Sequence, residues 1–329
     1  MRRIRCILVA VKEPTAKSQP ALAKAAQLAR ALDAALVLFE AIDAPLYLES
    51  SGGGLTGIRN IERSTQQACR ARLERHAQRV RKLGVRVEVL AEWDYPAYEA
   101  VVRAARRVDA DLIVAERHAG RHTGAALLHL NDWELLRRAP VPVLLVKRRG
   151  LYRRPRVLAA VDPDRRYAKP VQLDRDILAA GAGIAAALGG SLHVVHAFSP
   201  VPLSAYSQGI LSEEILANLQ RRSAQTAAAK LERLAGRAGV PAARRHLIAR
   251  HPSDAIEQAA AETGSAIVVM GALARSGLRR LLIGNTAERV LDHLPCDLLV
   301  VKPSGFGGAV PRSPRGARYL SVRSGSVFR

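Results

Sequence analysis

Cysteine is scarce in this sequence, with three residues among 329. Cys6, Cys69 and Cys296 lie far apart, and none belongs to a Cys-x-x-Cys pair or to the spacing of a zinc site. Small secreted domains often depend on several disulfides, so this scarcity argues against that class. We expect the three thiols to be reduced and mostly buried.

Long apolar runs are also absent. No stretch reaches the roughly 20 apolar residues that a membrane-spanning helix needs. The apolar run at residues 6–11 is short, Lys12 ends it, and no small-residue cleavage pattern follows, so we expect no signal peptide. These absences predict a cytoplasmic protein without membrane insertion.

Aromatic and acidic residues are few. Aromatic residues make up 4% of the chain and do not alternate with basic ones, which argues against a base-stacking surface for nucleic acid. The 51 Lys and Arg outnumber the 29 Asp and Glu, and the formal net charge is +22. This charge is typical either of solvated basic helix faces or of a surface for nucleic acid or another anionic partner. The first is favoured, because the arginines between residues 70 and 81 share one predicted helix with Leu73 and Val80.

The chain contains an internal duplication. Residues 111–147 align without a gap on residues 266–302, a shift of 155 positions. Each half has an ordinary domain length and can bury its own core. We therefore predict a first domain at 1–149, a linker at 150–155 and a second domain at 156–303.

Each half alternates short apolar runs with longer amphipathic ones. Continuous runs such as 7–11, 112–115 and 266–270 predict strands that are buried on both faces, and intervening stretches such as 59–83 predict helices. Strands that alternate with helices form βαβ crossovers and a parallel sheet. We expect two doubly wound, Rossmann-like α/β domains in tandem, each with five parallel strands. Ser253 is the expected N-cap of one of the helices.

The last segment, residues 304–329, has a different composition. It is rich in Gly, Ser, Pro and Arg, it contains five arginines, and it has no acidic residue and no helical period. Such a segment buries too little apolar surface to offset its ordering entropy. We expect a disordered basic tail that is dispensable for folding.

Three motifs in the second half resemble the universal stress protein family. They are Ala160-Val161-Asp162-Pro163, Gly284-Asn285-Thr286-Ala287-Glu288 and the run Cys296–Pro303. With the duplication and the segment Asp132–Arg137 of the first half, the whole chain resembles the tandem, E-type members of that family. The resemblance covers about residues 5–303 and implies a stress-response protein.

The resemblance also implies a nucleotide site in the second domain. ATP-binding members carry Gly-x2-Gly-x9-Gly-[Ser/Thr], and here the matching positions read Gly271-x2-Ala274-x9-Gly284-Asn285. Ala274 loses the backbone freedom of glycine, whereas Asn285 and Thr286 keep polar groups at a predicted helix start, where backbone N–H groups are unpaired. The expected site residues are Asp162, which matches the family's adenosine-contacting acid, together with Gly271, Ala274, Gly284, Asn285 and Thr286.

The first domain has lost this pattern. Its matching positions are Glu116, Ala119 and His129, and Lys12 stands where the second domain has Asp162. A carboxylate at position 116 would repel phosphate, so we expect no nucleotide in this domain. The nearby histidines are read as solvated side chains, and no metal is expected except Mg²⁺ that accompanies a nucleotide.

The sequence offers no catalytic residues, so the favoured function is a small-ligand binder, with ATP as candidate, that acts through conformation or partners and is not an enzyme. Three alternatives stay open: a weak ATPase of the same fold, a nucleic-acid-associated basic protein, and a binder of a lipid-like metabolite held between the domains. Family members dimerise through their last strand. The resemblance therefore implies an intramolecular pseudo-dimer through residues 143–146 and 298–301, or a homodimer.

Overall fold

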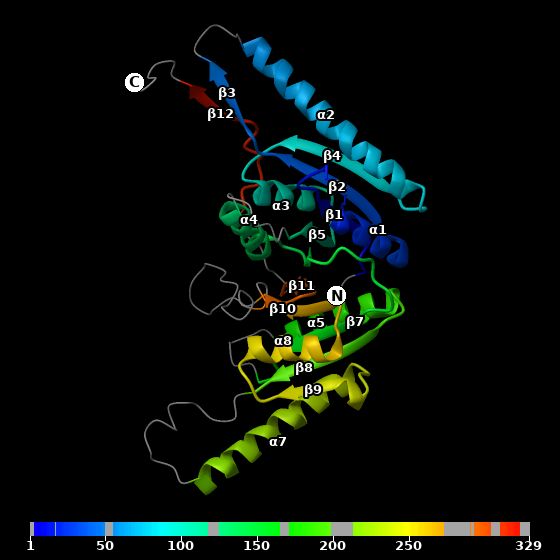
Figure 1. Ribbon diagram of the computed structural model, residues 1–329, viewed down its shortest axis with the longest axis vertical. Coiled ribbons are helices and arrows are strands. Elements are labelled where there is room, and N and C mark those ends of the chain that lie inside the picture. Colours follow the sequence, from blue (N-terminus) through cyan, green and yellow to red (C-terminus); the bar gives the residue numbers. More distant parts are fainter. Residues whose placement is uncertain are drawn as a thin grey trace. The chain divides into compact units, whose positions relative to one another are not determined.

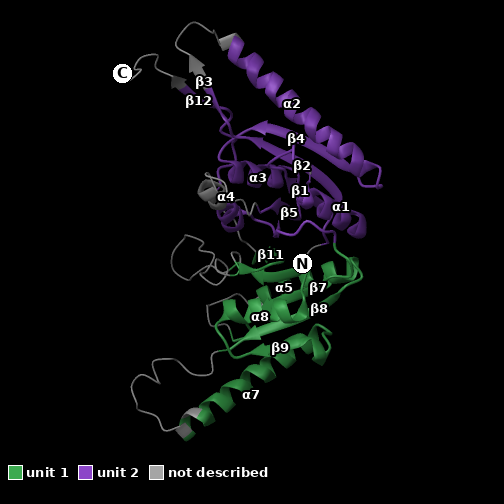
Figure 2. Cartoon of the chain, viewed as in Figure 1, with its two compact units in different colours: residues 1, 152–306 green, residues 2–151, 307–329 purple. Residues whose placement is uncertain are grey.

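The computed structural model describes residues 3–16, 18–49, 55–117, 125–164, 171–198, 213–272, 290, 293–303 and 310–322. The chain forms two compact units, coloured separately in Figure 2. One unit contains residues 152–306 and is called the C-terminal domain below. The other, the N-terminal domain, contains residues 2–151 together with residues 307–329.

The N-terminal domain is built on a parallel sheet of five strands. Their order is β4-β2-β1-β5-β6. The strands are β1 (Cys6–Ala10), β2 (Ala35–Ile42), β4 (Val87–Trp93), β5 (Leu112–Glu116) and β6 (Val143–Val146), and the helices are α1 (Pro20–Leu32), α2 (Leu55–Arg81), α3 (Ala97–Arg107) and α4 (Ala125–Arg138) (Figure 1). The strand β1 is apolar throughout, and β2 and β5 are apolar except for Glu40 and Glu116, because helices cover both faces of such a sheet.

The C-terminal domain repeats this architecture in the order β11-β10-β7-β8-β9, again with parallel pairing. The strands are β7 (Arg156–Val161), β8 (Ser191–Ala197), β9 (Arg245–Ile248), β10 (Ile267–Gly271) and β11 (Asp297–Val301), and the helices are α5 (Val171–Ala187), α7 (Glu213–Arg237), α8 (Pro252–Thr263) and the short 3-10 helix η1 (Ala242–Arg244). Two doubly wound five-stranded domains were predicted, and the structure confirms this fold class. In each sheet the strand order reverses at the first strand of the domain, beside β5 or β10, and ligands of such folds bind at the carboxyl ends of the strands there.

One predicted helix cap is wrong. The helix α8 begins at Pro252, and its N-cap is His251, without a side-chain cap. Proline is favoured in the first turn because it needs no hydrogen bond for its nitrogen. Ser253 is instead buried, and its hydroxyl donates to Asp254 Oδ1 at 3.0 Å.

Residues 310–322 also differ from the disordered tail that was expected. Residues Arg318–Val322 form β12, which pairs in parallel with β3 (Pro45–Glu49) as a separate two-stranded sheet of the N-terminal domain (Figure 1). Val310 is buried, and its carbonyl accepts a hydrogen bond from Arg106 Nη1 at 2.9 Å. The segment is therefore anchored at both of its described ends. Residues 304–309 and 323–329 lie outside the described residues.

A buried group of charges holds the middle of this segment. The backbone N–H of Arg315 donates to Asp94 Oδ1, and its Nη2 donates to Glu99 Oε2, both at 2.9 Å. Arg103 joins the two acids, with Nε 2.6 Å from Asp94 Oδ2 and Nη1 3.1 Å from Glu99 Oε2. The expectation of disorder was wrong here because composition cannot show an acidic docking site more than 200 positions away in the sequence.

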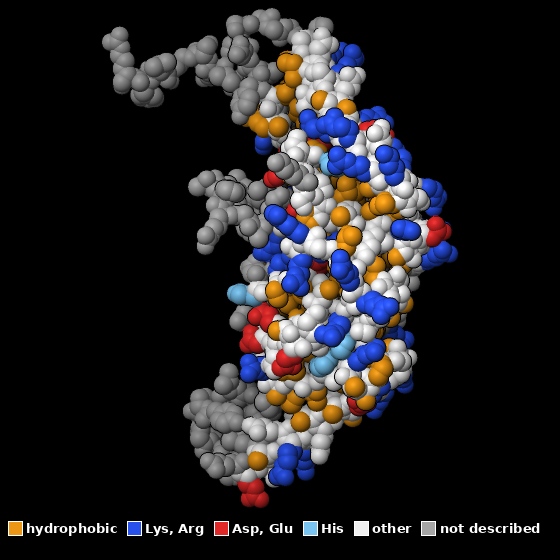
Figure 3. Space-filling model, turned by 45° about the vertical axis from the view of Figure 1, so that its right-hand side comes forward, with side chains coloured by type: hydrophobic (Ala, Val, Ile, Leu, Met, Phe, Trp, Pro, Cys, Tyr) orange, Lys and Arg blue, Asp and Glu red, His pale blue; other side chains and the backbone are white. Residues whose placement is uncertain are grey.

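No helix in the described part of the chain is long and apolar enough to cross a membrane. Lys and Arg side chains are scattered over the face shown in Figure 3, among apolar and acidic side chains.

Candidate functional site

The carboxyl ends of β7 and β10 form the switch point of the C-terminal sheet, because these strands are neighbours in parallel register. Asp162 directly follows β7 and is half-buried, and Gly271 is the last residue of β10. Two of the predicted site residues therefore lie at the expected edge. Ala274, Gly284, Asn285 and Thr286 lie outside the described residues.

The loop that carries Asp162 is fixed by the next helix. The backbone N–H of Asp162 donates to Asp174 Oδ1 at 3.0 Å, and Asp174 lies in the first turn of α5 and is buried. A carboxylate in the first turn of a helix interacts favourably with the positive end of the helix dipole. This bond links the residue that follows β7 to the first turn of α5 at the sheet edge.

Close packing explains why position 271 is a glycine, and the sequence pattern did not show this. A Cβ at this position would lie 2.7 Å from Leu173 Cδ2 and 2.9 Å from its Cγ. Leu173 is a fully buried residue of α5, so the strand and the helix approach this closely only with glycine. The presence of this glycine is therefore weak evidence for a phosphate contact.

A cluster of charged side chains that was not predicted lies beside this edge. Asp164 accepts a hydrogen bond from Lys230 Nζ at 2.7 Å, and its Oδ2 lies 3.2 Å from His196 Nε2. Burial raises the pKa of Asp164, but the bond from Lys230 and the nearby His196 outweigh it, so the pKa lies below its ordinary value. The other ring nitrogen of His196 lies 3.3 Å from the Val161 carbonyl, so both nitrogens face oxygen acceptors.

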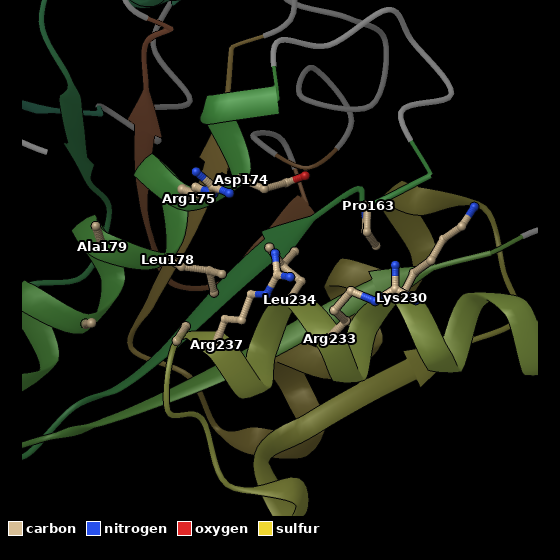
Figure 4. Close-up of a pocket in the computed structure, with 11 residues that line it drawn as sticks. Pro163, Asp174, Arg175, Leu178, Ala179, Lys230, Arg233, Leu234 and Arg237 are labelled. Atoms are coloured by element: carbon tan, nitrogen blue, oxygen red, sulfur yellow. The ribbon is translucent and has the colours of Figure 1, made fainter.

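Next to this cluster, α5, α7 and Pro163 border a cavity of about 680 Å³ (Figure 4). We call it the α5–α7 groove. Leu178 and Leu234 supply apolar surface, and Arg175, Arg233 and Arg237 supply positive charge. Lys230 borders the groove as well as bonding Asp164.

The N-terminal domain is different at the corresponding edge. Lys12 follows β1 and forms an ion pair with Asp132, whose side chain is 5% exposed. The cavity bordered by Lys12 and Glu116 has a volume of about 20 Å³, which is room for about one water molecule. The absence of a nucleotide from the first domain stays a prediction, and His118, His122 and Ala119 lie outside the described residues.

Strand register and sequence relate the two domains position by position. The β1–β2 pair has the same register as the β7–β8 pair, which makes Glu40 on β2 the counterpart of His196 on β8. Residues 71–77, ARLERHA, match residues 229–235, AKLERLA, so Arg72 is the counterpart of Lys230. In the N-terminal domain these two counterparts face each other, with Glu40 Oε1 3.7 Å from Arg72 Nη2.

No described residues form a group of three or more His, Cys, Asp or Glu side chains that could hold a metal ion. The signal that could have revealed the charged cluster was His196, an ionisable residue that follows two valines in the strand β8. Asp164, which contacts His196, and Lys230, which donates to Asp164, lie outside the strand of His196, and the sequence gives no spacing that joins them.

A sequence model of the Universal stress protein family matches residues 3–147 and 155–302. Universal stress protein E of Photorhabdus laumondii is 26% identical over 316 residues, which is 91% of this chain and 95% of the relative. The protein of the same name from Escherichia coli K12 is 26% identical over 235 residues, or 68% of this chain and 70% of the relative.

Two solved structures are also similar to this chain over most of its length. A protein of unknown function from Pseudomonas aeruginosa PAO1 is 26% identical, has a TM-score of 0.65, and matches 91% of this chain and 93% of its own. A universal stress protein from Archaeoglobus fulgidus is 17% identical, with a TM-score of 0.58 over 90% of this chain and 96% of its own, a likeness of fold alone. Both likenesses extend over the two domains.

Proposed function

This chain belongs to the universal stress protein family, and from that premise we propose that it is a stress-response protein whose C-terminal domain binds a small anionic ligand. ATP is the candidate ligand, at the carboxyl edge of β7 and β10. The observation that carries the proposal is the contrast between the two edges. Asp162 stands half-buried on a loop fixed by Asp174, whereas Lys12 is paired with Asp132 beside a cavity of about 20 Å³.

We propose binding without turnover, with the ligand changing the conformation or the partners of the protein. Among the described residues that follow β7, β8, β10 and β11, there is no Ser, Thr or Cys to serve as a nucleophile beside His196. The sequence likewise shows no nucleophile and base that can be placed at this edge. Pairing of the two domains through their last strands stays a prediction.

Calorimetry with MgATP on the full chain tests the proposal. We expect micromolar or weaker affinity in the native protein, because Ala274 stiffens the loop, and tighter binding in Ala274→Gly. Asp162→Ala should weaken binding about tenfold, the value of one lost hydrogen bond to a charged group. Lys12→Ala is the matched control at the corresponding position and should leave the affinity unchanged. Absence of ATP binding in both the native chain and Ala274→Gly would refute the assignment.

Lys and Arg side chains are scattered over the face in Figure 3 and form no concentrated basic patch there. This face therefore does not favour the alternative of a nucleic-acid-associated protein. A salt titration separates the two functions, because binding to a nucleic acid backbone weakens steeply with salt.

A further inference from the structure

We propose that the α5–α7 groove of the C-terminal domain is a second binding site, and that it takes an anionic amphiphile. By this we mean a molecule with one carboxylate, sulfonate or phosphate head and an apolar body. The proposal does not depend on ATP binding at the edge of the sheet, because different residues carry it.

The volume and the apolar surface of the groove suit a small organic molecule. Its volume of about 680 Å³ falls within the roughly 300–1,000 Å³ of ligand pockets. Figure 4 shows Leu178 of α5 and Leu234 of α7 between the two helices. The residues next to Leu178 on α5 that border the groove, Ala179 and Ala182, have small side chains and so leave space. An apolar body therefore gains burial here.

The charges of the groove select the head of the ligand. Arg233 and Arg237 follow Lys230 at positions i+3 and i+7, which places all three on one face of α7, and Arg175 comes from α5. The side chains of these three arginines make no hydrogen bond or ion pair with any residue that the structure describes. The acidic side chain in the lining, Asp174, already accepts the N–H of Asp162. Like charges around one cavity repel each other, and a bound anion relieves that repulsion.

The N-terminal domain supplies a natural control for this site. Its α2 keeps the basic positions, with Arg75 and Arg79 as counterparts of Arg233 and Arg237. The counterpart of Leu234, however, is His76, whose ring nitrogen Nε2 donates to the Pro14 carbonyl at 2.8 Å. In the N-terminal domain, a polar ring that is hydrogen-bonded to the loop after β1 therefore stands where the C-terminal domain has the apolar side chain of Leu234. The positive charge is thus common to both domains, and the apolar surface is particular to the C-terminal one.

Three probes separate the contributions of head and body. Calorimetry on the full chain would use laurate, dodecyltrimethylammonium and inorganic phosphate, each below any micelle-forming concentration. We expect one molecule of laurate to bind per chain, and the cation with the same tail to bind at least about tenfold more weakly, because charged hydrogen bonds are lost. Phosphate alone should not displace laurate. Equal binding of the cationic probe, or full competition by phosphate, would overturn the proposal.

Matched variants locate the site. Arg233→Glu should weaken laurate binding about tenfold or more, whereas the counterpart Arg75→Glu should leave it unchanged. Leu234→His, which introduces the residue of the N-terminal domain, should also abolish most of the binding, and circular dichroism and melting would show that the variant still folds. Equal losses for Arg75→Glu and Arg233→Glu would indicate non-specific adsorption and refute the site. ATP titrations of the same variants report on the separate proposal for the sheet edge.

Discussion

In the N-terminal domain Glu40 lies against Arg72 in the space between β2 and α2, and in the C-terminal domain the same two positions hold His196 and Lys230. The first pair also contacts Cys69, whose Sγ accepts from Arg72 Nη2 at 2.9 Å, and it is incompletely bonded, because Glu40 Oε2 and Arg72 Nε have no hydrogen-bond partner. In the second, Asp164 supplies the carboxylate, and Lys230 keeps 41% of its side chain exposed beside the groove. At equivalent positions, one copy thus holds a carboxylate against a cation, whereas in the other the cation Lys230 also borders the α5–α7 groove.

The duplicated helices show the same division. Glu99 and Arg103 are buried on α3, whereas the corresponding positions of α8, counted from the N-caps Pro96 and His251, are Asp254 and Gln258, which are only half-buried. The N-terminal domain uses its charges to bind residues 310–322 of its own chain. The N-terminal copy thus anchors a segment of its own chain, and ligand binding by the C-terminal copy is the proposal made above.

Arg103→Ala is the strongest test of the anchoring role. Arg103 is 6% exposed and bonds both Asp94 and Glu99, so its removal leaves the buried Asp94 carboxylate without a cation and Glu99 with Arg315 alone. We expect a loss of about 3–5 kcal/mol in the free energy of unfolding of the N-terminal domain, measured by denaturant titration. Arg107→Ala on the same helix, which removes a more exposed pair with Glu92, should cost no more than about 1 kcal/mol. Similar losses in the two variants would contradict the buried-cluster argument.

Removal of the C-terminal segment should have the next largest effect. A chain that ends at Pro303 loses β12 and the bonds from Arg315 to Asp94 and Glu99. Bonds to charged groups contribute about 1.5–3 kcal/mol, so we expect a loss of about that size in the N-terminal domain. Differential scanning calorimetry should show a lower melting temperature for this domain and an unchanged one for the C-terminal domain. Equal melting of the short and full chains would restore the expectation of a disordered tail.

A methyl group at position 271 should lower the free energy of unfolding by a smaller amount, and only in the C-terminal domain. Gly271→Ala places a Cβ against Leu173, and overpacking of this kind costs about 1–3 kcal/mol. The corresponding residue of the N-terminal domain is Glu116, which already carries a side chain at the end of β5. Glu116→Ala should therefore change the unfolding free energy of its domain by less than Gly271→Ala changes that of the other. Chemical denaturation of both variants checks this difference.

The fold could be predicted because its signals are local and repeated. Continuous apolar runs define the strands, and the match of residues 111–147 with 266–302 defines two copies of one domain. Asp162 could be placed at the sheet edge because it follows a strand directly. The docking of Arg315 on Asp94 could not be predicted, because it joins residues 221 positions apart in a segment of low complexity. The cluster of Asp164, His196 and Lys230 was missed because its members come from different elements, 32 and 66 positions apart, with no spacing that joins them.

The smallest expected effect is a difference in pH dependence between the two domains, and its sign distinguishes them. Burial raises the pKa of Glu40 above its ordinary value, against the opposing influence of Cys69 and Arg72. Ionisation of Glu40 therefore costs stability as the pH rises above about 4.3, the ordinary value for Glu.

Asp164 has the opposite sign, since its pKa is lowered, so its contribution is present above about 3.9, the ordinary value for Asp, and is lost as the pH falls through the folded-state pKa. Between pH 3 and pH 7, the unfolding free energy of Glu40→Gln relative to the native protein should rise with pH, and that of Asp164→Asn should fall. Each change should be about 1 kcal/mol or less, because burial and the charged or hydrogen-bonding partners of each carboxyl act on its pKa in opposite directions. Urea titrations at several pH values measure the two slopes, and slopes of the same sign would show that the two domains do not differ in the way these charges are held.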